Sequence, residues 1–252
     1  MADYRALLDY GQYYAARSGS EAQSPTGRRV LFSATGWHNP PGVQCRTQIH
    51  LVPRDLAIDA QGRLTFNPIP EIASLRVAEQ GVRLELTGGA AAASTTEPTK
   101  TSVAGSRLEL VLNCSGTPIA SSGNVVALRI LANPDQSGSW QQYTEVGYNY
   151  SSERLFVDHT HTGAKASTKP PIVQTAPLRG GAASDGGAVE IYILVDNGLV
   201  ESFANRRAVI SSFASELMGD TTPTPADRAV FVAPVPDGVT CAFAGWPLIS
   251  LM

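Results

Sequence analysis

Charged residues are scarce in this 252-residue sequence: they make up 16% of it, where about a quarter is usual. The 19 basic residues are scattered among 22 acidic ones, so no nucleic-acid partner is expected. No apolar run approaches the roughly 18 residues that cross a membrane, so no membrane partner is expected either. Asp3, Arg5 and Asp9 interrupt the segment where a signal peptide needs its apolar core. We therefore expect no signal peptide, and the compartment stays open.

Cysteine is also rare. Cys45, Cys114 and Cys241 lie far apart and form no CxxC pair, so neither a zinc site nor a disulfide framework is indicated. We expect three unpaired thiols, with one disulfide bond and one leftover thiol as the alternative. Two glycosylation sequons, at Asn113 and Asn149, are no more than chance provides in a sequence rich in Ser and Thr.

Several catalytic motifs are missing. The sequence contains no GxSxG, P-loop, dinucleotide-binding or HExxH motif, which removes the commonest motif-defined enzyme classes. We expect no cofactor and no metal.

The sequence does contain many short apolar segments that are separated by turn-forming residues. Several alternate apolar with polar residues, as half-buried strands do. Asp196-Asn197-Gly198 predicts a hairpin with a type I′ turn, because Asn and Gly tolerate positive φ. Many short strands with few helices indicate an all-β sandwich or barrel. The expected strands are 82–86, 107–112, 125–131, 154–157, 189–195, 199–203, 208–213 and 229–233.

Other segments read differently. Only residues 68–74 and 214–218 are expected to be helical. Residues 17–28, 88–102 and 163–188 are rich in small and polar residues and are expected to be long loops.

The segment Asp158-His159-Thr160-His161 is a candidate metal clamp, because residues i and i+2 of a strand share a face. A third ligand is not evident, and the remaining histidines are His38 and His50. We therefore favour solvated loop histidines.

Three acidic residues surround the predicted hairpin: Glu190, Asp196 and Glu201. They are candidates for the paired carboxylates of glycoside hydrolysis, although a structural role at strand ends is favoured. Aromatic residues are candidates for stacking on sugar rings, with packing in the core or at its rim as the favoured alternative. These aromatic residues are Trp37, Trp140, Tyr148 and Tyr150.

Three stretches, taken in order, resemble glycoside hydrolase family 32, the invertases and fructan hydrolases. Residues 9–16 (DYGQYYAA) and 27–31 (GRRVL) are similar to the family's DYG-x-YYA and RRVLWGW strands. VPR at 52–54 and the segment 61–76 are similar to the exit from the family's propeller. The third stretch comprises RLFVDHTHTG at 154–163 and the hairpin at 189–209, which resemble the family's sandwich signatures.

The resemblance implies a fold and a domain plan. Family members have a five-bladed propeller followed by a β-sandwich of two sheets. On this plan residues 1–58 are the end of the last blade, 59–76 a linker and 77–252 the sandwich. Strands are then expected at 10–15 and 29–34, and this remnant blade would lack cover on one broad apolar face.

The resemblance also implies catalytic motifs that the sequence does not contain. The family's nucleophile lies in NDPNG, its transition-state Asp in RDP and its acid/base Glu in EC, and none of these occurs here. Arg54-Asp55-Leu56 matches the PR segment instead of RDP. Phe32-Ser33-Ala34 and Arg46 stand where the family has tryptophans. We expect no catalytic residue in this chain and no activity from it alone.

The leading expectation is thus the C-terminal portion of a family 32 glycosidase that acts on sucrose or fructans, with the sandwich as a structural or accessory module. The alternative is a free-standing carbohydrate-binding or protein-interaction sandwich, and an unrelated lectin is a third reading. The expected partners are a sucrose- or fructan-type ligand and a partner chain, or a second copy, at the uncovered blade.

Overall fold

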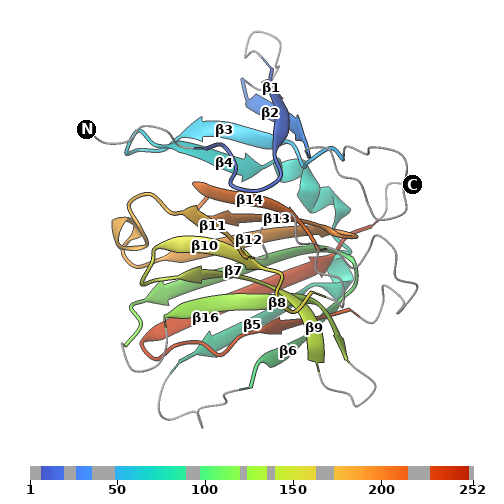
Figure 1. Ribbon diagram of the computed structural model, residues 1–252, viewed down its shortest axis with the longest axis vertical. Coiled ribbons are helices and arrows are strands. Elements are labelled where there is room, and N and C mark those ends of the chain that lie inside the picture. The colour runs from blue at the N-terminus through green and yellow to red at the C-terminus, as the bar shows by residue number, and fades with distance from the viewer. Residues whose placement is uncertain are drawn as a thin grey trace.

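The protein is built almost entirely from antiparallel β-sheets, as the sequence predicts (Figure 1). One sheet has four strands and two sheets have six each. No described helix is long and apolar enough to cross a membrane. The computed structural model describes residues 7–19, 27–35, 49–88, 97–119, 124–134, 140–162, 173–214 and 228–249.

The first of these sheets, the N-terminal sheet, is a simple meander in which each strand pairs with the next along the chain. Its strands are β1 (Tyr14–Ser18), β2 (Arg29–Ala34), β3 (Arg54–Ile58) and β4 (Leu64–Pro68). β2 coincides with the expected strand at 29–34, whereas β1 begins near the end of the expected strand at 10–15 and runs into the expected loop at 17–28. β4 lies inside the segment that we expected to be a linker.

The two six-stranded sheets face each other and form the predicted sandwich. We call them the proximal sheet, which contacts the N-terminal sheet, and the distal sheet. In spatial order the proximal sheet contains β14 (Ala208–Phe213), β13 (Leu199–Ala204), β12 (Val189–Asp196), β7 (Arg107–Gly116), β16 (Val239–Pro247) and β5 (Val82–Thr87). The distal sheet contains β11 (Val173–Pro177), β10 (Arg154–Asp158), β9 (Trp140–Asn149), β8 (Val125–Pro134), β15 (Ala229–Val232) and β6 (Thr99–Ala104).

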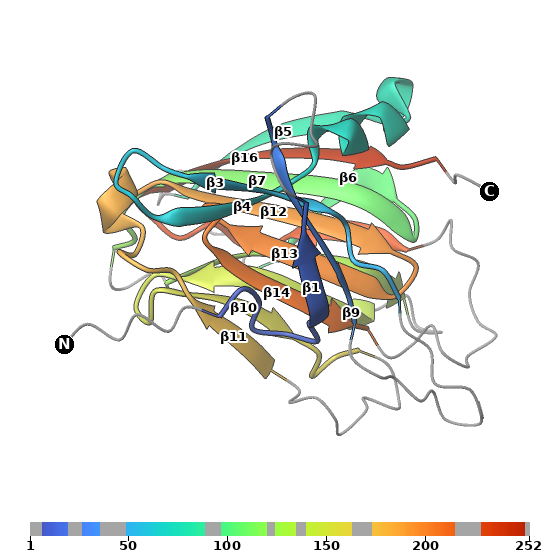
Figure 2. The same cartoon turned by 90° about the horizontal axis from the view of Figure 1, so that it is seen from above.

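The main core fills the space between these two sheets. Leu108, Leu110 and Leu112 on β7 are fully buried, as alternation along a strand requires. Every residue of β13 and β14 is buried, so these two strands are covered on both faces. The second cover is the N-terminal sheet, which lies over them in Figure 2.

The N-terminal sheet docks through apolar side chains. Leu31 and Phe66 pack with Phe203 and Val209 of the proximal sheet in one cluster, and Leu51 joins Leu199 and Phe213 in another. The face that carries Leu31 and Phe66 is therefore covered by the sandwich. Other apolar side chains of this sheet stay about half exposed, namely Tyr14 at 48% and Phe32 at 53%.

The segment before β1 adds further pairing. The backbone N–H groups of Tyr10 and Gln12 donate to Val209 O and Ser211 O of the edge strand β14, at 2.9 and 2.7 Å. A Cβ atom on Gly11 would lie 1.9 Å from Ser211 O, so only glycine allows this approach. Residues 10–12 thus cover a sheet edge that would otherwise expose unpaired backbone groups.

All eight expected strands of the sandwich are present, but four strands were not predicted. Two of these overlap the expected loops: β6 begins in the loop at 88–102 and runs past it, and β11 lies inside the loop at 163–188. Both are edge strands, whose polar residues hide the strand pattern. The other two, β9 and β16, contain glycine and many polar or small residues. The turn expected near 68–74 is present as the 3-10 helix η2 (Pro70–Leu75), followed by η3 (Ala78–Gln80). The expected helix at 214–218 lies outside the described residues beyond Ala214.

The predicted hairpin joins β12 to β13, with Asp196 opposite Leu199 in the register. Asn197 takes a positive φ of 56°, whereas Gly198 is not among the residues with positive φ. The expectation of a type I′ turn is wrong, because that turn needs a positive φ at both Asn197 and Gly198.

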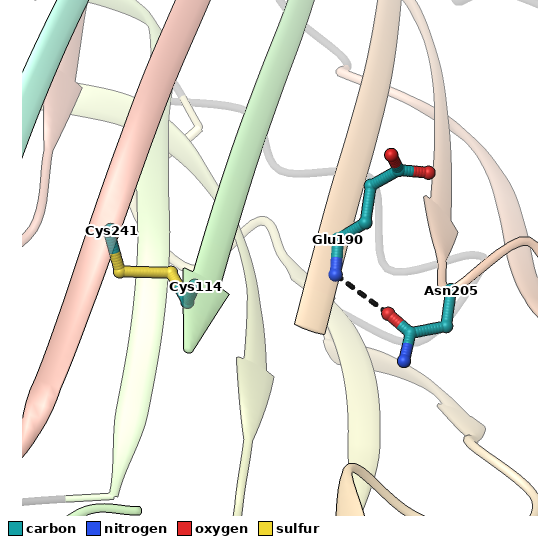
Figure 3. The surroundings of a disulfide bond; sticks show 4 residues. All are labelled: Cys114, Glu190, Asn205 and Cys241. Carbon is teal, nitrogen blue, oxygen red and sulfur yellow. Dashed lines mark hydrogen bonds between the residues drawn. A yellow bond between two sulfur atoms is a disulfide. The ribbon is translucent and has the colours of Figure 1, made fainter. Parts of the chain in front are cut away.

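A disulfide bond joins Cys114 of β7 to Cys241 of β16 (Figure 3). The two residues lie directly opposite each other in the register of adjacent strands, with a Cα–Cα distance of 4.1 Å. The expectation of three unpaired thiols is wrong, and the alternative of one bridge is confirmed. The pairing joins residues 127 positions apart, so it comes from the sheet and is invisible in local spacing. Cys45 lies outside the described residues.

Candidate functional site

A groove of about 700 Å³ lies where the β3–β4 turn of the N-terminal sheet meets the rim of the sandwich, and most of the residues that line it are polar or charged. Its walls come from that turn, from the end of β7, from the start of β12 and from the β13–β14 turn. Apolar groups of Ala57, Ile58 and Val189 also line it, and it contains both donors and acceptors of hydrogen bonds. The residues that matter below are Arg63, Asn113, Asp185, Glu190, Asn205 and Arg206.

Asp185 holds the groove together. It ends the short 3-10 helix η4 (Ala183–Asp185), and its carboxylate contacts the guanidinium groups of both Arg63 and Arg207. It also accepts a hydrogen bond of 2.6 Å from the Asn205 amide. Arg63 reaches back to Asp59 of its own turn at 2.6 Å. The network thereby links the N-terminal sheet to the sandwich and fixes the shape of the groove.

The β13–β14 turn supplies the opposite wall. Asn205 Oδ1 accepts a hydrogen bond of 2.6 Å from the backbone N–H of Glu190, as Figure 3 shows beside the disulfide bond. The Glu190 carboxylate accepts one of 3.1 Å from Arg206 Nε. Both turn residues have positive φ, 44° for Asn205 and 58° for Arg206. Such strained residues persist where surrounding contacts hold them, and here those contacts aim polar groups at the groove.

The floor carries side chains that are open to a ligand. Asn113 and Ser115 on β7 are exposed, because they alternate with the buried Leu112 and Cys114. Asn67 Oδ1 is buried at the groove and has no hydrogen-bond partner among the described residues. Amide, hydroxyl, guanidinium and carboxylate groups in this mixture suit a neutral molecule with many hydroxyl groups.

A second polar cluster is buried between the N-terminal sheet and the proximal sheet, and we call it the ion cluster. Arg54 Nη2 lies 2.9 Å from Asp9 Oδ2, 2.9 Å from Glu201 Oε2 and 2.8 Å from Ser211 Oγ. Arg54 is fully buried, and burial raises the pKa of the Glu201 carboxyl, with the Arg54 charge opposing it. The ion cluster therefore joins two sheets and is closed to substrate.

The ion cluster brings together one residue from each of the three stretches that resemble the family. Asp9 belongs to the first stretch, Arg54 to VPR and Glu201 to the hairpin at 189–209. In the folded chain they meet at one point of contact between sheets. These motif residues hold the architecture together.

The three carboxylates around the hairpin do not form the acid/base pair considered from the sequence. Glu190 and Asp196 stand near opposite ends of β12, and six residues of strand span about 20 Å. Glu201 is buried in the ion cluster, and Asp196 pairs with Arg107 on the surface. These contacts indicate a structural role for the three carboxylates, which is the role that the sequence favoured.

The two histidines do not form a metal clamp. His159 is buried, its Nε2 lies 2.6 Å from Ser212 Oγ, and burial lowers its pKa to about 4. His161 stacks on Tyr143 with ring centroids 4.8 Å apart. Among the described residues no group of His, Cys, Asp and Glu is arranged to hold a metal. The expectation of solvated loop histidines is wrong for His159, because β14 covers its ring.

The candidate sugar-stacking aromatics have mixed outcomes. Tyr148 is fully buried, and its hydroxyl accepts a hydrogen bond from the Ala182 N–H, so it belongs to the core. Tyr150 packs edge-on against Tyr148 at the rim, with a centroid distance of 5.2 Å. Trp37 and the side chain of Trp140 lie outside the described residues.

The groove itself was missed in the sequence. Arg63 and Arg207 lie in stretches that resemble the family, but neither was given a role there, and Asp185 lies in an expected loop. The three residues lie more than 20 positions apart along the chain. The sequence holds no signal for their meeting. Of the groove residues, Asn113 was singled out as a sequon and Glu190 as a candidate carboxylate. Asn149, the other sequon residue, accepts hydrogen bonds from the backbone of Ser151 and Ser152.

Comparison with known proteins identifies the class to which this sandwich belongs. Residues 71–215 match the family model for the C-terminal domain of glycosyl hydrolases family 32. The match covers more than half of the chain, and the chain belongs to this family. The resemblance seen in the sequence is thereby confirmed. No curated protein sequence matches the chain.

Solved structures with the same fold cover nearly the whole chain. An exo-inulinase from Aspergillus awamori superposes with a TM-score of 0.69 at 18% identity, over 96% of this chain and 44% of the inulinase. A variant of fructan 1-exohydrolase IIa from Cichorium intybus in complex with 1-kestose superposes with a TM-score of 0.68 at 17% identity, over 95% of this chain and 48% of the exohydrolase. A fructofuranosidase from Schwanniomyces occidentalis complexed with fructosylnystose superposes with a TM-score of 0.68 at 14% identity, over 96% of this chain and 49% of the fructofuranosidase. The chain thus spans less than half the length of these proteins.

Proposed function

We propose that this chain is the non-catalytic, C-terminal part of a family 32 glycosidase that acts on sucrose or fructans, and that it serves as an accessory module. The absence of NDPNG, RDP and EC from its sequence supports this proposal, because a retaining glycosidase needs a nucleophile and an acid/base. The purified chain should release no fructose from sucrose, inulin or levan. Turnover by the purified chain would refute the assignment of the chemistry to another part of the protein, and its loss in Glu190→Gln would place the site in this chain.

We propose the order of the family plan, which is a last blade, a linker and a sandwich, with the expected bounds of 1–58, 59–76 and 77–252 shifted at the linker. The four-stranded meander supports a blade, and β4 suggests that the blade extends to Pro68. Residues 69–80, which carry η2 and η3, would then be the connection. Limited proteolysis tests this, and cleavage between β3 and β4 under native conditions would contradict the extension of the blade to Pro68.

We propose that the groove is where the module contacts carbohydrate. The observation that carries this proposal is the exposed polar floor of Asn113 and Ser115 beneath walls held by Asp185 and Glu190. Sugar hydroxyls are recognised by such fixed donors and acceptors. The 1-kestose and fructosylnystose bound by two structural relatives make fructose-containing oligosaccharides the first ligands to test.

The test uses calorimetric titration of the chain with 1-kestose. The double variant Asn113→Ala, Arg206→Ala removes two groove groups that lie outside the Asp185 network. We expect it to weaken binding about tenfold, since each lost hydrogen bond costs about 0.5–1.5 kcal/mol. Arg83→Ala, at an exposed position of β5, is the matched control and should leave the affinity unchanged. No detectable binding by the wild-type chain would refute the proposal.

A partner chain is the second candidate, favoured by the half-exposed Tyr14 and Phe32 of the N-terminal sheet. Clustered apolar side chains on a surface favour association. Light scattering of the wild type against Phe32→Ser measures it. A wild-type chain that stays monomeric at high concentration would refute self-association.

A further inference from the structure

A second cavity, of about 490 Å³, opens at the end of the sandwich, between the proximal and distal sheets. We call it the end cavity. Its size falls within the roughly 300–1,000 Å³ of small-molecule sites. Tyr150 forms an aromatic wall, Asn124 and Glu153 supply polar groups, and Gly116, Gly186 and Gly187 form the remaining side.

The end cavity begins where the groove ends. Ser115 lines the groove and the next residue, Gly116, lines the end cavity. The same holds on the facing segment, where Asp185 lines the groove while Gly186 and Gly187 line the end cavity. The end of β7 in the proximal sheet and the segment after Asp185 therefore border both spaces. The two meet at the end of this sheet.

The boundary between them, which we call the saddle, is made of glycine. Gly116, Gly186 and Gly187 have φ values of 105°, 67° and 84°, a range that other residues rarely adopt. A Cβ on Gly187 would lie 3.2 Å from Gly116 O, so these two backbones pack closely. A Cβ on Gly186 would meet nothing within 4 Å. No side chain of these three residues therefore stands between the groove and the end cavity.

The end cavity combines an aromatic side chain with polar groups, a combination that suits a sugar. Burial raises the pKa of Tyr150 to about 12, so the phenol stays neutral and protonated at physiological pH. Glu153 is the one charged residue among those that line the end cavity within the described chain, and it takes a positive φ of 53°. An aromatic wall beside an acceptor and an amide suits a sugar ring, whose apolar face packs on the aromatic group and whose hydroxyls bond to the rim.

We propose that the groove, the saddle and the end cavity form one continuous binding track for a neutral oligosaccharide longer than the groove alone accommodates. The inference rests on the proposed function, because it extends the same site. It specifies the ligand as an extended chain of sugar units. It also gives the glycines of the saddle a role, since a bulky side chain there would divide the track.

The experiment compares 1-kestose with an inulin-type oligosaccharide of about ten units by calorimetric titration of the full chain. A continuous track should bind the longer ligand about tenfold more tightly, which is 1.4 kcal/mol. Gly186→Phe should reduce the affinity for the longer ligand to that for 1-kestose and leave 1-kestose binding unchanged. Gly186→Ala is the matched control: it carries the same backbone strain without the obstructing ring and should keep most of the preference for the longer ligand.

The outcomes separate this inference from the proposed function. If 1-kestose binds and depends on Asn113 and Arg206, but the longer ligand binds no more tightly, the groove stands and the continuous track is refuted. Equal loss in Gly186→Phe and Gly186→Ala also refutes the track, because strain alone would explain it. If neither ligand binds, both proposals fail. The chain-length comparison uses the wild type alone, so it decides the matter even if Gly186→Phe does not fold.

Discussion

Arg54 offers the most direct test of the claim that the ion cluster joins the N-terminal sheet to the sandwich. The perturbation is Arg54→Met, which keeps an apolar stem and removes the charge. In the wild type Nη2 lies 2.9 Å from a carboxylate oxygen of Asp9 and of Glu201, and all three side chains are at most 1% exposed. Removing one partner of such a buried cluster costs about 3–5 kcal/mol of unfolding free energy. For a chain of this size that is about 6–20 °C in Tm.

The pH dependence of this loss gives a second criterion. Burial raises the pKa of Glu201 above its usual 4.5, so its proton is bound more tightly in the folded state. The stability that this proton contributes is complete below about pH 4.5 and is lost as the pH rises through the raised pKa. Without Arg54 the ionised carboxylate has no counter-charge. The deficit of Arg54→Met should therefore be largest at neutral pH and shrink in acid.

Urea unfolding at pH 7 and at about pH 4.5 measures both quantities, with the denaturant slope as a check on two-state behaviour. Arg28→Met is the matched control, because Arg28 also contacts two carboxylates, Asp55 and Glu71, but does so at the surface of the same sheet. Screening by water should make its effect clearly smaller. The reasoning is refuted if Arg54→Met loses no more stability than Arg28→Met, or if its deficit is the same at both pH values.

Three further predictions concern single residues. Gly11→Ala should lower the unfolding free energy by about 1–3 kcal/mol, because it breaks two backbone hydrogen bonds to β14. The control is Gly19→Ala, whose added Cβ meets open space and should leave the unfolding free energy unchanged. Equal urea midpoints for the two variants would contradict the docking of residues 10–12. Cys114→Ser should lower the unfolding free energy by about 2–5 kcal/mol, because it removes the disulfide bond. A thiol assay of the denatured, unreduced wild type should detect one reactive thiol among the three cysteines, and three reactive thiols would exclude the disulfide bond. His159, with its pKa lowered to about 4, binds its proton more tightly when unfolded, so stability is complete above about pH 6.5 and falls by about 3 kcal/mol towards pH 3. An NMR titration that puts the His159 pKa near 6.5 would contradict its burial.

Much of the fold was predictable because it rests on local patterns. The alternation of buried Leu108, Leu110 and Leu112 with half-buried or polar neighbours marks β7 as a strand with one face in a core. The edge strands β6 and β11 escaped prediction, since an edge position leaves fewer residues that need to be apolar. β13 and β14 were predicted as strands, but their burial on both faces depends on the sheet that docks over them.

The sequence by itself determined the all-β class, the β12–β13 hairpin and the family, because apolar period, turn residues and motif order are properties of neighbours along the chain. Only the tertiary structure decided what the motif residues do. Arg54 is 45 residues from Asp9 and 147 from Glu201, and a carboxylate reads the same in a sequence whether it faces substrate or a buried guanidinium. The same holds for Cys114 and Cys241 and for the groove around Asp185. Burial and pairing are set by which surfaces come together when three sheets pack, and that information is spread over the whole chain.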